Sequence, residues 1–167
     1  MIHGWVRPVV GLGVMIGRMG ALFGYYAAAD GEDAVRAVVR ADGQPTGTGY
    51  DSFVVKGVDP VVALLPAEVL VSGRTADDIE ADPRHGRLIG TAGDGGVVTL
   101  SLTDSFGDSL ARCDAKRLGE VARGWSASGV FDAQSDLTGL TGFLDDLAAL
   151  AERASVRGHR LYCWIRM

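Results

Sequence analysis

The side chains of this chain that could bind a small molecule are a histidine, arginines and several aromatic residues. His85 lies in a short segment with Pro and Gly, between Arg84 and Arg87, and such arginines could bind a carboxylate or a phosphate. Aromatic side chains could complete a pocket, although at strand and helix positions they usually pack in a core. The candidates for a ligand pocket are Tyr25, Tyr26, His85, Arg87 and Trp125.

Four acidic residues that lie close together form the second candidate site. Asp77, Asp78, Glu80 and Asp82 could gather around a divalent cation, which needs several oxygen ligands in one cavity. Neighbouring positions of a helix diverge by about 100°, however, so adjacent carboxylates do not point together. We therefore predict no metal site and interpret these acids as helix-capping groups and as a surface for a basic partner.

No pattern in the sequence assigns a catalytic residue or a cofactor. No two of the three histidines lie at metal-ligand spacing, and the two cysteines, Cys113 and Cys163, are interpreted as reduced thiols in the cytoplasm. The glycines between Gly11 and Gly17 superficially resemble a dinucleotide-binding fingerprint. They lack the preceding strand, the following helix and the acidic residue of that fingerprint, so the prediction is a chain without a cofactor.

The charge of the chain argues against nucleic acid as a partner. The sequence has 16 Lys and Arg against 21 Asp and Glu, a net charge of −5, and offers no basic footprint for a phosphate backbone or an anionic membrane. The apolar run from Pro8 to Gly17 is too short to span a bilayer. A secretory signal is an alternative interpretation of that run, but Arg18 separates it from the small residues at 27–29 that could be cleaved. We predict a cytoplasmic protein with no membrane segment, and the sequence gives no oligomeric state.

The sequence predicts an N-terminal extension over residues 1–18 and a single domain over residues 19–167. Translation could begin at Met15 or Met19, which would leave the residues before them with little structural role. A chain of 167 residues, 47% of them hydrophobic, is long enough for one domain with its own core. No linker or repeat divides residues 19–167.

Hydrophobic periodicity and capping residues predict an α+β domain. We expect a small mixed or antiparallel sheet packed with about five helices, in which a long C-terminal helix precedes a final buried strand beside the first strand. The strands are predicted at 21–28, 50–56, 87–91, 97–102 and 160–165. The helices are predicted from Glu32, over 61–71 with a break at Pro66, after Thr75, after Thr103, after Asp114, and from Asp136 to Arg157.

Both ends of the predicted domain resemble a known family. The segment Met19-Gly-Ala-Leu-Phe-Gly-Tyr-Tyr26 places Met-Gly before an aromatic strand, and the chain closes with a helix and the strand around Gly158-His-Arg-Leu-Tyr-Cys-Trp164. This layout is similar to the YfbM-like family of small bacterial proteins, from which the central apolar helix with Pro66 departs. The resemblance implies an α+β fold and carries over no catalytic residue, because that family has no assigned activity.

Two hypotheses of function follow from these observations. The first is a cytosolic accessory or immunity-type module that masks a basic surface of a partner protein through Asp77, Asp78, Glu80 and Asp82. The alternative is a small-molecule-binding protein or an enzyme with a pocket near Tyr25, His85 and Trp125. Geometry separates the two, because the second requires that the candidate pocket residues line one cavity.

Overall fold

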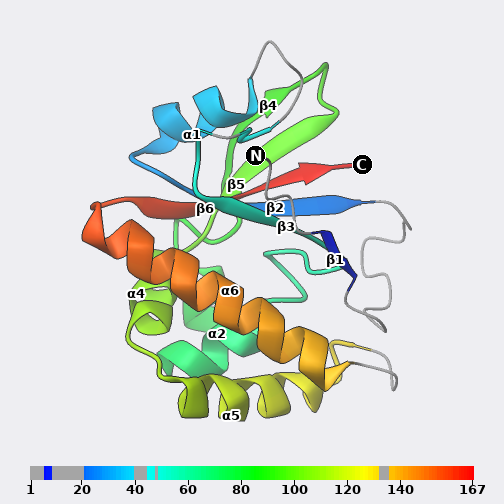
Figure 1. Ribbon diagram of the computed structural model, residues 1–167, viewed down its shortest axis with the longest axis vertical. Helices are drawn as coiled ribbons and strands as arrows, with labels where there is room; N and C mark the ends of the chain where they lie inside the picture. The colour runs from blue at the N-terminus through cyan, green and yellow to red at the C-terminus, as the bar shows by residue number, and fades with distance from the viewer. Residues whose placement is uncertain (1–5, 9–20, 40–44, 48, 132–135) are drawn as a thin grey trace.

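A computed structural model describes residues 6–8, 21–39, 45–47, 49–131 and 136–167. Within these residues the chain folds as an α+β domain around one sheet of six strands in the order β1-β3-β2-β6-β5-β4 (Figure 1). The short edge strand β1 runs parallel to β3, and the other neighbours are antiparallel. The strands are β1 Val6–Pro8, β2 Leu22–Ala28, β3 Ser52–Lys56, β4 Leu88–Ala92, β5 Val97–Ser101 and β6 Arg160–Arg166. The predicted fold class is therefore confirmed.

The first and last long strands pair with each other, as predicted, and they form the centre of the sheet. β2 and β6 pair along seven residues, from Leu22 opposite Arg166 to Ala28 opposite Arg160. The run from Leu161 to Trp164 is fully buried, because helices cover both faces of these central strands.

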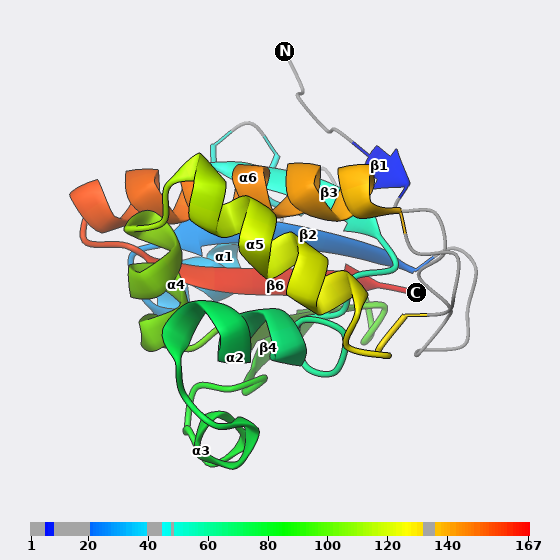
Figure 2. The same cartoon turned by 90° about the horizontal axis from the view of Figure 1, so that it is seen from below.

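The helices are divided unequally between the two faces of the sheet. Helix α1 packs against β2, β4 and β5 on one face, whereas α4 and α6 contact β6 on the other, with α2 and α5 behind them (Figure 1). The short helix α3 extends from the end of α2, away from the rest of the domain (Figure 2). The helices are α1 Gly31–Val38, α2 Leu65–Ser72, α3 Ala76–Glu80, α4 Asp104–Ala111, α5 Ala115–Ser126 and α6 Leu137–Val156.

Two hydrophobic cores follow from the alternation of side chains along the strands. Phe23, Tyr25 and Ala27 of β2 face the large core beneath α6, which also holds Trp125. Tyr26 and its neighbours on the opposite face form a smaller core against α1. The face that a residue occupies in β2 is therefore set by its position in the strand.

Capping side chains set five of the six helix starts within the described residues, and four of these caps, Thr75, Thr103, Asp114 and Asp136, lie at predicted helix starts. Asp30, Thr75, Thr103, Asp114 and Asp136 each accept a hydrogen bond from a backbone N–H in the first turn of the helix that follows. These bonds satisfy donors that have no partner within the helix. At its other end α6 is followed by glycine 158 in a left-handed conformation, with φ of 67°, which only glycine adopts without strain.

Three sequence predictions differ from the structure or lie outside it. The predicted helix over 61–71 begins at Leu65, because Asp59 accepts backbone N–H groups of a preceding turn and Pro66 falls in the first turn of α2. Strand β1 lies within the predicted extension 1–18 and joins the sheet through β3. The glycine fingerprint at 11–17 and the possible starts Met15 and Met19 lie outside the described residues.

Candidate functional site

Two of the predicted pocket residues are core residues on the α6 side of the sheet. Tyr25 is fully buried and its hydroxyl donates to the Val58 carbonyl at 2.7 Å; burial raises its pKa well above the ordinary value. Trp125 is also fully buried, and its indole Nε1 donates to the Ala63 carbonyl at 2.7 Å. The Phe143 ring lies between them, 5.3 Å from the Tyr25 ring and 5.7 Å from the Trp125 ring. Both side chains therefore fill the core.

Tyr26 lies on the other face of the sheet from Tyr25. Its hydroxyl shares a 2.6 Å hydrogen bond with Thr99 Oγ1 and donates to the Ala34 carbonyl of α1 at 2.7 Å. Consecutive residues of a strand point to opposite faces, so the two tyrosines cannot line one cavity. This hydroxyl fastens α1 to the sheet.

His85 and Arg87 lie in the loop that leads into β4. The His85 ring is half-buried, and its Nε2 atom is buried without a hydrogen-bond partner among the residues that the structure describes. Burial lowers the pKa of His85, against the opposing effect of Glu80 and Asp82. Arg87 is exposed. The five candidate pocket residues thus occupy two cores and a surface loop, and the structure does not bring them together.

The predicted acidic site is divided by the structure into exposed and paired residues. Asp77, Asp78 and Glu80 are exposed on α3 and make no ion pair with a described residue. We call these three residues the α3 acidic surface. Asp82 is half-buried and its Oδ2 lies 3.0 Å from Arg74 Nη1. Burial acts to raise the pKa of Asp82, but hydrogen bonds from the Arg84 N–H and from Arg74 outweigh it and lower the pKa.

Arg74 holds the segment that carries the α3 acidic surface. Its Nη1 donates to Asp82 Oδ2 and to Ser105 Oγ at 2.7 Å, and its Nη2 donates to the Asp78 carbonyl at 3.1 Å. Ile79 anchors the same helix, since its side chain is fully buried. The guanidinium and the apolar anchor fix a helix of one turn that propensity alone would not stabilise.

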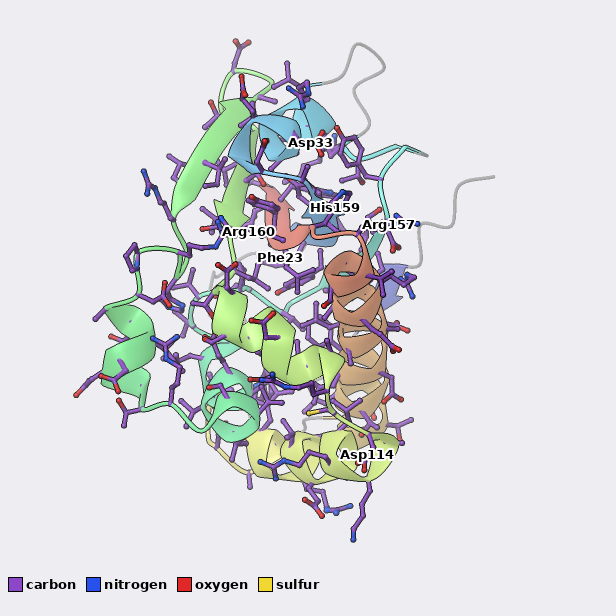
Figure 3. All side chains as sticks on the ribbon, turned by 90° about the vertical axis from the view of Figure 1, so that its left-hand side faces the viewer. Phe23, Asp33, Asp114, Arg157, His159 and Arg160 are labelled. Carbon is purple, nitrogen blue, oxygen red and sulfur yellow. The ribbon has the colours of Figure 1, made fainter. Side chains whose placement is uncertain are left out.

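A pocket between α4 and α6 is a further candidate site, which the sequence did not predict. Figure 3 faces this side of the molecule, with Arg157, His159 and Arg160 at the end of α6 and Asp114 beyond the far end of α4. The pocket has a volume of about 280 Å³. Its lining residues come from two distant segments and are Thr103, Asp104, Gly107, Asp108, Ala151, Ala154, Ser155, Gly158, His159, Arg160 and Leu161. We call this cavity the α4–α6 pocket.

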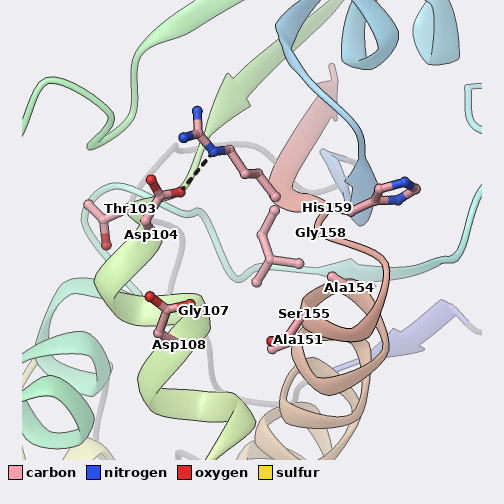
Figure 4. A pocket seen from close by; sticks show the side chains of 11 residues that line it. Thr103, Asp104, Gly107, Asp108, Ala151, Ala154, Ser155, Gly158 and His159 are labelled. Carbon is pink, nitrogen blue, oxygen red and sulfur yellow. Dashed lines mark ion pairs between the residues drawn. The ribbon is translucent and has the colours of Figure 1, made fainter.

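The α4–α6 pocket carries charges of both signs at its rim (Figure 4). Asp104 Oδ1 lies 3.5 Å from Arg160 Nε and 3.3 Å from Arg84 Nε. Asp108, one helical turn further along α4, makes no hydrogen bond or ion pair within the described residues. The His159 ring points away from α4. The rim thus offers one carboxylate, of Asp104, that is neutralised by arginine and one, of Asp108, that has no cationic partner within the described ranges.

The floor of the α4–α6 pocket consists of small residues. Gly107 lies on α4, and Ala151 and Ala154 are buried on the facing side of α6. A Cβ added at Gly107 would lie 3.4 Å from Leu161 Cδ1, so the missing side chain helps to keep the cavity open. In the sequence, small residues at Ala151, Ala154 and Ser155 and the pair of acids at Asp104 and Asp108 were available signals. Neither signal shows that the two helices meet.

Neither a metal site nor a membrane helix is found in the described part of the chain. No group of three or more His, Cys, Asp and Glu side chains in the described residues could hold a metal ion. None of the helices in these residues is both long and apolar enough to cross a bilayer. Comparisons with family models, curated proteins and solved structures found no match to this chain, so the similarity to the YfbM-like family stays a prediction.

Proposed function

We propose that this chain is a cytoplasmic accessory module, of the immunity type, that binds a basic surface of a partner protein through the α3 acidic surface. The observation that supports the proposal is that Asp77, Asp78 and Glu80 are exposed, without an ion pair to any described residue, on a helix fixed by Arg74 and Ile79. A rigid group of charges loses little conformational entropy on binding, and complementary charges speed and orient association. The cytoplasmic location is supported by Cys113 and Cys163, which are both free thiols.

Asp82 does not belong to this proposed interface. Its carboxylate is engaged by Arg74 and by the backbone N–H of Arg84, so a partner would have to break an internal ion pair to reach it. We assign Asp82 a positioning role, because it orients the arginine that holds α3.

Reversal of charge at two positions tests the proposal. Asp77→Lys with Glu80→Lys leaves Asp78 near the helix start and changes the net charge from −5 to −1. The matched control, Asp145→Lys with Glu152→Lys on α6, changes two exposed acids and produces the same net charge. An exposed charge pair about 4 Å apart is worth roughly 1 kcal/mol in water. The α3 variant is therefore expected to bind a basic partner at least about tenfold more weakly, and the α6 variant nearly as well as the original chain.

The assay is capture of proteins from the native lysate by each tagged form, at low and at high salt, followed by mass spectrometry. We expect one stoichiometric basic protein that the original chain and the α6 variant retain, that the α3 variant loses, and that high salt releases because it screens exposed charges. Equal retention by the α3 variant would refute the proposal, as would a chain that captures no protein. Far-UV circular dichroism of both variants shows that they remain folded.

A further inference from the structure

We infer that the α4–α6 pocket binds a small zwitterion of the α-amino acid class. The inference rests on the lining of one cavity, which combines an arginine, a carboxylate without a cationic partner among the described residues and a floor of small or apolar residues. No residue of α3 lines the pocket, so this inference is independent of the proposed function.

The carboxylate of such a ligand is expected to meet Arg160. The closest contact of Arg160 with Asp104 is through Nε, at 3.5 Å, and no hydrogen bond within the described residues engages the Arg160 side chain. A guanidinium has five N–H donors in a fork that matches a carboxylate. The Arg160 side chain is 53% exposed, so its donors are accessible from solvent. Asp104 orients this guanidinium and leaves most of its donors free.

The ammonium group is expected to meet Asp108. Side chains four residues apart on a helix lie on the same face, so Asp108 stands beside Asp104 at the pocket rim. Unlike Asp104, it has no cationic partner among the described residues. The C-terminal end of the 20-residue helix α6 also borders the pocket and adds a partial negative charge that favours a cation. The exposed Ser155 hydroxyl also lines the pocket and can donate a hydrogen bond to a polar ligand group.

The floor limits the ligand to a small molecule. Gly107, Ala151 and Ala154 present only hydrogen or methyl groups, and Leu161 is apolar. A volume of about 280 Å³ lies at the lower limit of ligand pockets, which suits an amino acid with a short or aliphatic side chain. Because the charged groups are half-exposed, we expect a Kd on the order of 0.1–1 mM.

The test is titration of the full chain, labelled with ¹⁵N, with L-alanine, L-serine and L-leucine, observed by NMR. Propionate and ethylamine serve as probes that carry one charge each. We expect saturable shifts of the amides of Gly107, Ser155 and Gly158 with at least one amino acid and at least tenfold weaker binding of both single-charge probes. Ethylamine that binds as well as the amino acids would overturn the inference in favour of a simple cation site. Propionate that does so would overturn it in favour of an anion site, and the absence of shifts with any probe would also refute it.

Matched variants locate the ligand. Asp108→Asn and Arg160→Gln are each expected to weaken amino acid binding at least tenfold. Asp145→Asn and Arg157→Gln, which change exposed residues outside the pocket lining, are expected to leave binding unchanged. Equal effects of the pocket variants and their controls would contradict the inference.

Ser155→Tyr tests the site by steric exclusion of the ligand. Ser155 is exposed, so the larger side chain can be accommodated without disturbing the core, and it is expected to occupy the cavity and abolish binding without removing either charge. Retained binding in the folded variant would place the ligand elsewhere. Thermal unfolding of each variant shows that the fold is preserved.

Discussion

Replacement of Gly24 by alanine is expected to strain the centre of the sheet. Gly24 lies in β2 between Val54 of β3 and Trp164 of β6. The indole of Trp164 lies directly over it, so that an added Cβ would be 2.0 Å from Trp164 Cε2. Ordinary van der Waals contact begins at 3.4 Å, and the indole must therefore move by more than an ångström. Trp164 is 97% buried, which leaves it little room to do so.

The size of the stability loss expected for Gly24→Ala follows from the position of Gly24 in the sheet. Inserting a methyl group into a packed core costs about 1–3 kcal/mol, and paired strands on both sides prevent the β2 backbone from moving away. We therefore expect a loss of about 3 kcal/mol in the free energy of unfolding. For a domain of this size each kcal/mol lowers Tm by about 2–4 °C, so the expected decrease in Tm is about 6–12 °C.

Urea unfolding followed by far-UV circular dichroism measures this loss, and two comparisons isolate its cause. Gly119 lies in α5 and an added Cβ would meet no atom within 4 Å, so Gly119→Ala is expected to stabilise the protein by about 0.5–1 kcal/mol through helix propensity. In a chain that already carries Trp164→Leu, Gly24→Ala is expected to cost less than about 1 kcal/mol, because the clashing indole is gone. An equal cost of Gly24→Ala with and without the indole would refute the steric explanation.

Two further predictions concern buried polar groups. Burial raises the pKa of Glu68, so the stability linked to this group is present at acidic pH and is lost as pH rises through its folded-state pKa. Glu68→Gln, whose amide oxygen can still accept a hydrogen bond from the Thr103 hydroxyl, is therefore expected to gain stability relative to the original chain as pH rises from 4 to 8, as measured by urea unfolding. A difference in the free energy of unfolding between the two chains that stays constant over this pH range would contradict the prediction. Tyr25→Phe leaves the buried Val58 carbonyl without its donor and is expected to cost about 1–2 kcal/mol; an unchanged urea midpoint would show that the hydroxyl is not structural.

Local signals in the sequence were sufficient for most elements of the fold. A capping side chain and the N–H that it satisfies are two or three residues apart, so the helix starts after Thr75, Thr103 and Asp114 could be predicted from the residues themselves. Gly93, Gly95 and Gly96 are likewise typical of a hairpin loop, and they lie between the paired strands β4 and β5. Helix α2 starts at Leu65, later than the predicted helix over 61–71, because Asp59 caps a separate turn before Pro66. Such a capped turn has the same local sequence as a helix start.

The candidate sites could be predicted only in part, because they depend on which elements pack together. The residue types of Tyr25, Tyr26 and Trp125 suggested a pocket, but the alternation along β2 already places the two tyrosines on opposite faces. The α3 acidic surface lies within one segment and was therefore visible in the sequence. The α4–α6 pocket joins Gly107 to Ala151 and Ala154, a contact that no local pattern records.

The start of α4 connects both proposed surfaces through three consecutive residues. Thr103 donates to Glu68 of α2 at 2.6 Å, Asp104 pairs with Arg84 and with Arg160 of the α4–α6 pocket, and Ser105 accepts from Arg74, which holds α3. A substitution at any of these residues would disturb more than one element at once. Asp77, Glu80, Asp108 and Ser155 are exposed and take no part in these contacts. Those positions can therefore separate partner binding from ligand binding, whereas the start of α4 cannot.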